Sequence, residues 1–460
     1  MNNYKKFKSI VALSLFAISF LGGCSSSSNS GDGDKNETDD DSDSLILTDS
    51  NSDSSTYGYS DSDSNLIETP PELPVKCEII SRNQQLSGMG DGKNLSIDFD
   101  GTDVFGAWTY VTSQETLPHI ETGMFQSETG SFDIQSYLSG SVIAEDTFLT
   151  ASDGKFALVW LDGRTDWDPD CLSSNVDKCI KDVAFMTFKG GFPEASAPLR
   201  ITENRDNIIG RPKAASIDNS FIVVWRESGS LGGTTVFLSI VDSDLNVGKP
   251  VKISDDDHGD TFDNLILSAS SESILVMWST LHNYEIEFRL LNPDGTIKSE
   301  IKKIDTASQY FYPSSAADDN GYLVSWSRKL VNDYEIFTQR IDEDGNLEGE
   351  ENRITFTDSD IYESKLSFSS HDGLMITWLS SKENGSTTCI DSSCSKKAFA
   401  APLNIDGTLQ ASPLFIGPGT DYLASSENLS LSFAKDRWIT GYESFRNFRT
   451  QLAYSTFVCK

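Results

Sequence analysis

Phe156-Ala157-Leu158-Val159-Trp160 is a short apolar stretch that ends in an aromatic residue, and the pattern returns along most of the chain. The seven copies span residues 104–108, 156–160, 221–225, 274–278, 322–326, 374–378 and 438–442. Their last aromatic residues lie 48 to 65 residues apart. This period, with one apolar strand in each unit, indicates a repeat architecture in which neighbouring units bury each other's faces.

Each unit holds signals for four strands and few for helices. In one unit the expected elements are a first strand at 313–317, a turn at 318–321, the apolar second strand at 322–326, a third strand at 334–341, a turn at Asp344-Gly345 and a fourth strand near 352–356. Asp-Gly is a strong hairpin signal. The sequence therefore predicts an all-β, seven-bladed β-propeller, with six or eight blades or a pair of β-sandwiches as alternatives.

The two ends of this region are expected to close the ring. The last unit supplies strands near 428–433, through Tyr442 and at 451–458, but no fourth strand. Residues Val75 to Ile80 form a lone strand signal before the first unit. If that strand completes the last blade, Cys77 lies beside Cys459. We therefore expect a disulfide there.

Seven cysteines fit an oxidising compartment. With Cys24 set aside, six remain, and the expected pairs are Cys77 with Cys459, Cys171 with Cys179 and Cys389 with Cys394. Neither short spacing is a Cys-x-x-Cys motif, and the chain has only four histidines, so a zinc site is not expected. The two local pairs fall in the longest units, where they would pin inserted loops.

Residues 1–23 have the order of an export signal. Lys5, Lys6 and Lys8 precede an apolar run too short to span a bilayer, and Leu21-Gly22-Gly23-Cys24 follows. That ending resembles the lipobox of bacterial lipoproteins. The resemblance implies cleavage before Cys24, lipid (palmitate) on its side chain and membrane anchoring. Ser25, where an aspartate would imply retention at the inner membrane, favours the outer membrane, with the periplasmic or surface face left open.

Residues 24–74 are expected to be a disordered tether, and 75–460 the propeller. The tether is rich in Ser and Asp, which cannot repay the entropy of folding. The whole chain carries a formal charge of −34. Such a charge repels nucleic acid and anionic lipid headgroups. We expect a monomer that binds no nucleic acid.

The units also resemble a bacterial repeat of approximate form Val-Val-Trp-x-Asp-x-Arg, then Asp-Ile-Tyr-x-Gln-Arg and Asp-Gly. Residues 156–164 match its first half, and 334–340 with Asp344-Gly345 match its second. The resemblance covers about 95–458, with most copies drifted. It implies a propeller of secreted or surface lipoproteins, mostly without assigned activity.

Long loops are expected on one face of the ring, where strands two and three join and where successive blades join. Loops carry function more often than scaffolds do, so this is the expected ligand face. The candidate ligand residues are Trp167, Asp168, Asp257, His258, Asp260 and Asp360. Residues 255–260 offer hard oxygen ligands for Ca²⁺ but lack EF-hand spacing, and Asp342-Glu343-Asp344-Gly345 falls at a hairpin turn, so solvated turns are the favoured interpretation. No cofactor is expected.

Motifs for catalysis are missing from the sequence. It has no Gly-x-Ser-x-Gly elbow, no His-Glu-x-x-His and no Gly-rich phosphate loop. We therefore expect a membrane-anchored propeller that binds a protein or glycan partner. A hydrolase of polysaccharide or lactone, with acidic residues at the channel mouth, and a scaffold subunit of an envelope complex are the alternatives.

Overall fold

The structure is a computed structural model. It describes residues 75–86, 91–111, 117–137, 143–152, 154–164, 166–171, 179–203, 208–228, 233–255, 264–280, 285–306, 310–330, 333–356, 361–380, 397–417, 429–446 and 449–460. The predicted signal peptide, Cys24 and the tether lie outside these residues, as do Asp257, His258, Asp260, Asp360, Cys389 and Cys394.

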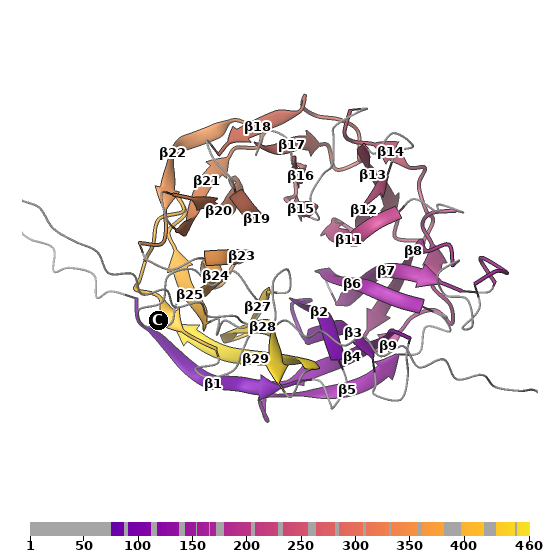
Figure 1. Ribbon diagram of the computed structural model, residues 1–460, viewed down its shortest axis with the longest axis horizontal. Coiled ribbons are helices and arrows are strands. Elements are labelled where there is room, and N and C mark those ends of the chain that lie inside the picture. The colour runs from indigo at the N-terminus through magenta and orange to yellow at the C-terminus, as the bar shows by residue number, and fades with distance from the viewer. Residues whose placement is uncertain are drawn as a thin grey trace, which may run out of the picture. The chain divides into compact units, whose positions relative to one another are not determined.

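The described residues form seven antiparallel sheets arranged in a ring (Figure 1), which confirms the predicted seven-bladed β-propeller. In chain order the sheets are β2(Asp91–Phe99), β3(Val104–Val111), β4(His119–Gln126), β5(Ser131–Tyr137); β6(Ile143–Ser152), β7(Lys155–Gly163), β8(Asp182–Lys189), β9(Phe192–Pro193), β10(Leu199–Arg200); β11(Ile208–Ile217), β12(Ser220–Ser228), β13(Thr234–Val241), β14(Val251–Lys252); β15(Ile266–Ala269), β16(Ile274–Ser279), β17(Glu285–Leu291), β18(Lys302–Asp305); β19(Tyr310–Asp318), β20(Gly321–Lys329), β21(Tyr334–Ile341), β22(Leu347–Arg353); β23(Ile361–Ser369), β24(Gly373–Ser380), β25(Lys397–Leu403), β26(Leu414–Phe415); and β27(Ser430–Ala434), β28(Arg437–Arg446), β29(Arg449–Cys459) with β1(Cys77–Gln85).

The apolar quintets form the second strand of every blade, and their sequence follows from the ring. Successive side chains of a strand point to opposite faces of its sheet. In β16, Leu275 and Met277 pack toward the following blade, whereas Val276 and Trp278 pack toward the preceding one. Both faces are buried, so the strand is apolar throughout instead of alternating.

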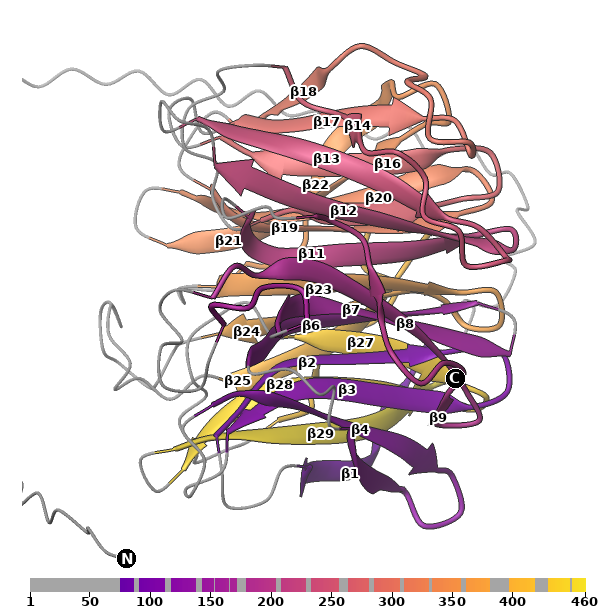
Figure 2. The ribbon, with the colours of Figure 1, turned by 90° about the vertical axis from the view of Figure 1, so that its right-hand side faces the viewer.

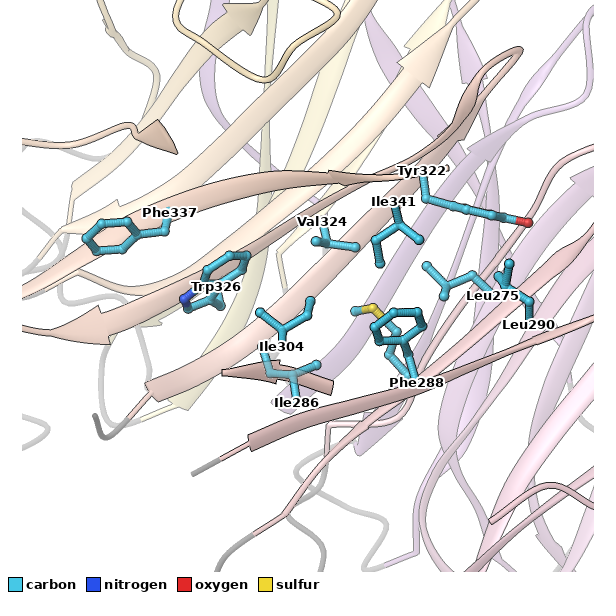
Figure 3. Packing of buried hydrophobic residues seen from close by; sticks show 11 residues of the cluster. Leu275, Ile286, Phe288, Leu290, Ile304, Tyr322, Val324, Trp326, Phe337 and Ile341 are labelled. Atoms are coloured by element: carbon cyan, nitrogen blue, oxygen red, sulfur yellow. The ribbon is translucent and has the colours of Figure 1, made fainter. Parts of the chain in front are cut away.

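One such interface lies between the fourth and fifth blades (Figure 3). Leu275, Phe288 and Leu290 from β16 and β17 pack against Tyr322 and Trp326 from β20. All five side chains are fully buried. Burying a large apolar side chain stabilises a fold by about 1.5–3 kcal/mol, so each interface contributes strongly to the ring.

The fourth strand of the fifth blade differs from its prediction near 352–356. It is β22, which begins at Leu347. The preceding turn is closed tightly, because the Asp342 carboxylate accepts from the main-chain N–H of Asp344 (2.9 Å) and Asn346 (2.7 Å). Because the turn is so short, β22 begins to pair with β21 directly after it, at Leu347. The same bonds give Asp342 a structural role as a turn residue.

The N-terminal strand closes the ring. The sheet order β1-β29-β28-β27 places β1 at the outer edge of the last blade, as Figure 1 shows beside the yellow β29. Cys77 and Cys459 form a disulfide, and so do Cys171 and Cys179. Disulfides of this kind belong to proteins that fold in an oxidising compartment, extracellular or periplasmic.

The first strands of the seven blades, called the inner strands below, are β2, β6, β11, β15, β19, β23 and β27. They belong to different sheets and do not share a ladder; Figure 2 shows the same ring from the side. Side chains join them instead. Main-chain N–H groups donate to a serine hydroxyl of the neighbouring blade from Leu149 to Ser96 (3.0 Å), from Leu366 to Ser314 (3.0 Å) and from Ile97 to Ser430 (2.7 Å).

Within the part of the chain that the structure describes, no helix is long and apolar enough to cross a membrane. Nowhere in the same ranges do three or more His, Cys, Asp or Glu side chains come together in a way that could hold a metal ion.

Candidate functional site

The candidate site is the channel at the centre of the ring. Its cavity of about 400 Å³ is lined by residues from all seven inner strands or their immediate flanks. Each inner strand begins at the face of the long loops and ends at the face of the tight turns. The cavity is therefore built from the scaffold itself and not from one loop.

Bulges near the start of the inner strands aim side chains into this channel. The pairing register shifts between Lys93 and Ser96 in β2, and again in β6 before Phe148. Asn94 and Asp146 occupy left-handed backbone conformations at these points, with φ of 58° and 57°. A bulge inserts one residue and re-aims its neighbours. The Asn94 side-chain amide donates to the Asp146 carboxylate (3.0 Å), which ties the two bulges together.

Three basic side chains gather around one aromatic ring in the channel. The Lys213 ammonium lies 4.8 Å from the centre of the Phe148 ring, the Arg211 guanidinium 5.3 Å and the Lys365 ammonium 6.0 Å. Arg211 and Lys213 come from β11 and Lys365 from β23. Cations are attracted to the face of an aromatic ring at such distances, and here three of them share one ring.

The Arg211 guanidinium is oriented by main-chain carbonyls of the two bulges. It donates to the carbonyl of Thr147 and to that of Asn94 (3.0 Å). The Thr147 hydroxyl donates to the same Asn94 carbonyl (3.1 Å). These carbonyl partners fix the direction of the guanidinium.

Two acidic residues also line the cavity. Asp98 accepts from the main-chain N–H of Phe99 (2.9 Å) and of Ala151 (2.8 Å), and Glu363 accepts from that of Leu429 (2.8 Å). Burial raises the pKa of Asp98 to about 6, although its hydrogen bonds oppose the rise. Both carboxylates thus bridge neighbouring blades while they face the channel.

Burial also shifts the pKa of Lys365, which lines the channel, and of Glu443, which lies outside the lining. Burial, with the charge of Arg211, holds the pKa of Lys365 below its ordinary value. Glu443 of β28 lies beside the bulge of β2, where its carboxyl accepts from the Asn94 N–H (3.1 Å). Burial, with the charge of Glu363, raises the pKa of Glu443 to about 8. Glu443 is therefore protonated at neutral pH.

Of the predicted ligand residues, Trp167 and Asp168 are described, and both contact residues of their own blade. The Trp167 ring lies beside the guanidinium groups of Arg164 (4.5 Å) and Arg200 (5.4 Å). Asp168 is only 8% exposed, and its carboxylate accepts from the N–H of Asp170 and Ile180. Their contact with a partner stays a prediction.

Sequence reasoning missed the channel residues Arg211, Lys213 and Lys365. No sequence signal singled them out, because the inner strands also carry other charged residues such as Asp98 and Glu363. The three residues come from two blades far apart in sequence, and only the closed ring brings them together.

No protein-family model matches the sequence, and no characterised protein matches it either. Solved structures are similar in fold. A sialidase of Trypanosoma rangeli aligns with a TM-score of 0.47 and 7% identity over 84% of this chain and 60% of its own length. The β-propeller domain of the Trilobed protease from Pyrococcus furiosus aligns with a TM-score of 0.47 and 9% identity over 81% of this chain and 94% of its own length. The polysaccharide lyase Uly1 aligns with a TM-score of 0.46 and 7% identity over 84% of this chain and 99% of its own length. This likeness concerns the propeller fold alone.

Proposed function

We propose that this protein is a lipid-anchored binding protein of the cell envelope, whose propeller holds its ligand at the central channel and the neighbouring loop face. The channel carries the proposal. Charged side chains lose hydration inside a protein and are retained there at a cost in stability, yet five of them line one cavity: Asp98, Arg211, Lys213, Glu363 and Lys365. A ligand that contacts them accounts for their presence.

Anchoring is proposed from residues 21–24, whose order resembles a lipobox, and the disulfide Cys77–Cys459 supports export. The experiment is metabolic labelling of expressing cells with a tagged fatty acid. We expect label on the wild-type chain and none on Cys24→Ser. Equal labelling of both chains would show that the lipid, if any, is elsewhere. Protease treatment of intact cells then separates surface from periplasmic exposure.

Binding is tested with the full-length protein immobilised in detergent. Envelope extract and a glycan array are applied, with a lipoprotein of unrelated fold as the control. We expect capture of one protein or glycan class that the control does not retain. Capture of nothing specific would count against the proposal. Co-purification with envelope proteins at a fixed stoichiometry would instead favour a scaffold subunit.

A hydrolase is the second candidate, because a carboxyl group that keeps its proton lies near a second carboxyl group that lines the channel. Burial and the charge of Glu363 raise the pKa of Glu443 to about 8, and Glu363 lines the cavity. Glycoside hydrolysis uses a pair of carboxyl groups, one of which donates a proton. Turnover of a polysaccharide or lactone that Glu443→Gln abolishes would favour this candidate over binding alone.

A further inference from the structure

The channel reverses the charge balance of the molecule. The chain has 36 Lys and Arg residues against 70 Asp and Glu residues. Among the described residues that line the cavity, three are basic and two are acidic. The basic groups are also concentrated, since each lies within 6.0 Å of the centre of the Phe148 ring.

We propose that Arg211, Lys213 and Lys365 form a binding site for an anionic group of a ligand, a carboxylate, sulfate or phosphate, that enters the central channel. The proposal rests on the proposed function, because it names the ligand class of that same channel. Guanidinium and ammonium groups make their strongest hydrogen bonds to such oxygens. Arg211 is already oriented by the carbonyls of Asn94 and Thr147, so it loses little freedom when an anion binds.

The acidic outer surface does not prevent this binding. At physiological ionic strength, charges in solvent are screened beyond about 8 Å. Groups inside the cavity are screened much less, so the local excess of basic side chains decides what binds there. The like charges of Arg211 and Lys365, together with burial, already hold the pKa of Lys365 low. A bound anion offsets that repulsion.

The other charged groups near the site and the size of the cavity determine which anions it can hold. Asp98 and Glu363 face Lys365 and favour its charged form, while Glu443 is protonated at neutral pH and adds no negative charge there. A cavity of about 400 Å³ admits a small anion or the acidic end of a short saccharide. The same chemistry thus serves a free inorganic anion or an acidic sugar, and the experiment has one arm for each.

The experiment is calorimetric titration of the full-length protein in detergent. The probes are a uronic-acid trisaccharide, a neutral trisaccharide of the same length, sodium sulfate and sodium phosphate. Lys213→Gln removes one of the three charges, and Lys298→Gln makes the same change on an exposed residue outside the channel. We expect an anionic probe to bind, Lys213→Gln to weaken it by about tenfold or more, and Lys298→Gln to leave it unchanged. Lys213→Arg keeps the charge and should keep binding.

Each result decides for or against the site. Binding of the uronic-acid trisaccharide alone supports it and identifies an acidic sugar, whereas binding of sulfate or phosphate alone supports it with a free anion as ligand. Equal binding of the neutral trisaccharide, or equal affinity of Lys213→Gln and Lys298→Gln, overturns it, as does silence of all four probes. Circular dichroism shows that the variants are folded. Capture of a protein or neutral glycan elsewhere would overturn this site but leave the proposed binding function standing.

Discussion

Cys77 and Cys459, which are 382 residues apart in the chain, face each other as partners in the β1–β29 ladder and are joined by a disulfide. This bond fixes the strand that completes the last blade. A cross-link over so long a segment restricts the unfolded chain far more than a short one does. We expect the double variant Cys77→Ser/Cys459→Ser to lose about 3–5 kcal/mol of unfolding free energy in urea denaturation.

The matched control is the double variant Cys171→Ser/Cys179→Ser, whose disulfide closes a segment with a sequence separation of only 8. Its loss should be smaller. A larger loss for this local pair would contradict the view that ring closure carries the stabilisation.

Asp162 is fully buried and accepts from the Trp160 indole (2.6 Å) and from Arg164 (2.8 and 2.6 Å). Asp162→Ala leaves the buried Arg164 guanidinium without this carboxylate, a change that costs about 3–5 kcal/mol in comparable sites. Asp166→Ala is the control, because Asp166 is exposed and lies 4.0 Å from Arg164. We expect it to change the unfolding free energy by less than about 1 kcal/mol. Similar losses for both variants in urea denaturation would refute this prediction.

Glu443 makes the protein less stable as the pH rises. Its folded-state pKa of about 8 lies above the ordinary 4.5, so between these values the folded state binds more protons than the unfolded state and stability falls with increasing pH. Glu443→Gln removes this titration and keeps an acceptor for the Asn94 N–H. We expect the variant to gain a few kcal/mol over the wild type at pH 8 and little at pH 4.5. Parallel pH profiles from denaturation would contradict this.

Gly407 is a contact between blades as well as a turn residue. It has a φ of +84°, and an added Cβ would lie 2.7 Å from Leu323 Cδ1 and 2.9 Å from Thr338 Oγ1 of the preceding blade. Gly373 has a similar φ of +74° but open space around it. Both alanine variants lose stability because alanine disfavours the left-handed backbone. Only Gly407→Ala also overpacks the interface, and we expect this to lower its free energy of unfolding by about a further 1–3 kcal/mol. Equal melting temperatures would refute the interblade contact.

The fold could be predicted from the sequence because the ring makes the second strand of each blade apolar throughout. Stretches such as Phe156–Trp160 are apolar on both faces, since both faces meet a neighbouring blade. The last unit lacked a signal for a fourth strand, which pointed to Val75–Ile80; the observed strand β1 begins at Cys77 and continues to Gln85, beyond the predicted end. The fourth strand of the fifth blade was placed too late, because a hydrogen-bonded turn at Asp342 shortens the return.

The channel residues could not be predicted. Arg211 and Lys365 belong to blades that are not adjacent in the sequence, and only closure of the ring brings them to one cavity. The bulges at Asn94 and Asp146 also break the two-residue alternation that would show which side chains point inward. Loop-based reasoning selected Trp167 and Asp168 instead, and the described contacts of these residues are with Arg164, Arg200 and main-chain groups of the same blade.

The pairing of β1 with β29 also fixes an order of events during folding. β1 precedes every blade in the sequence, yet its ladder partner in the described sheet is β29, the last of the described strands. Until β29 pairs with β1, the last sheet has an unpaired edge strand, and such an edge promotes aggregation. Ring closure therefore distinguishes complete from truncated chains, because a chain that ends before Cys459 cannot form the disulfide that joins the two ends of the ring.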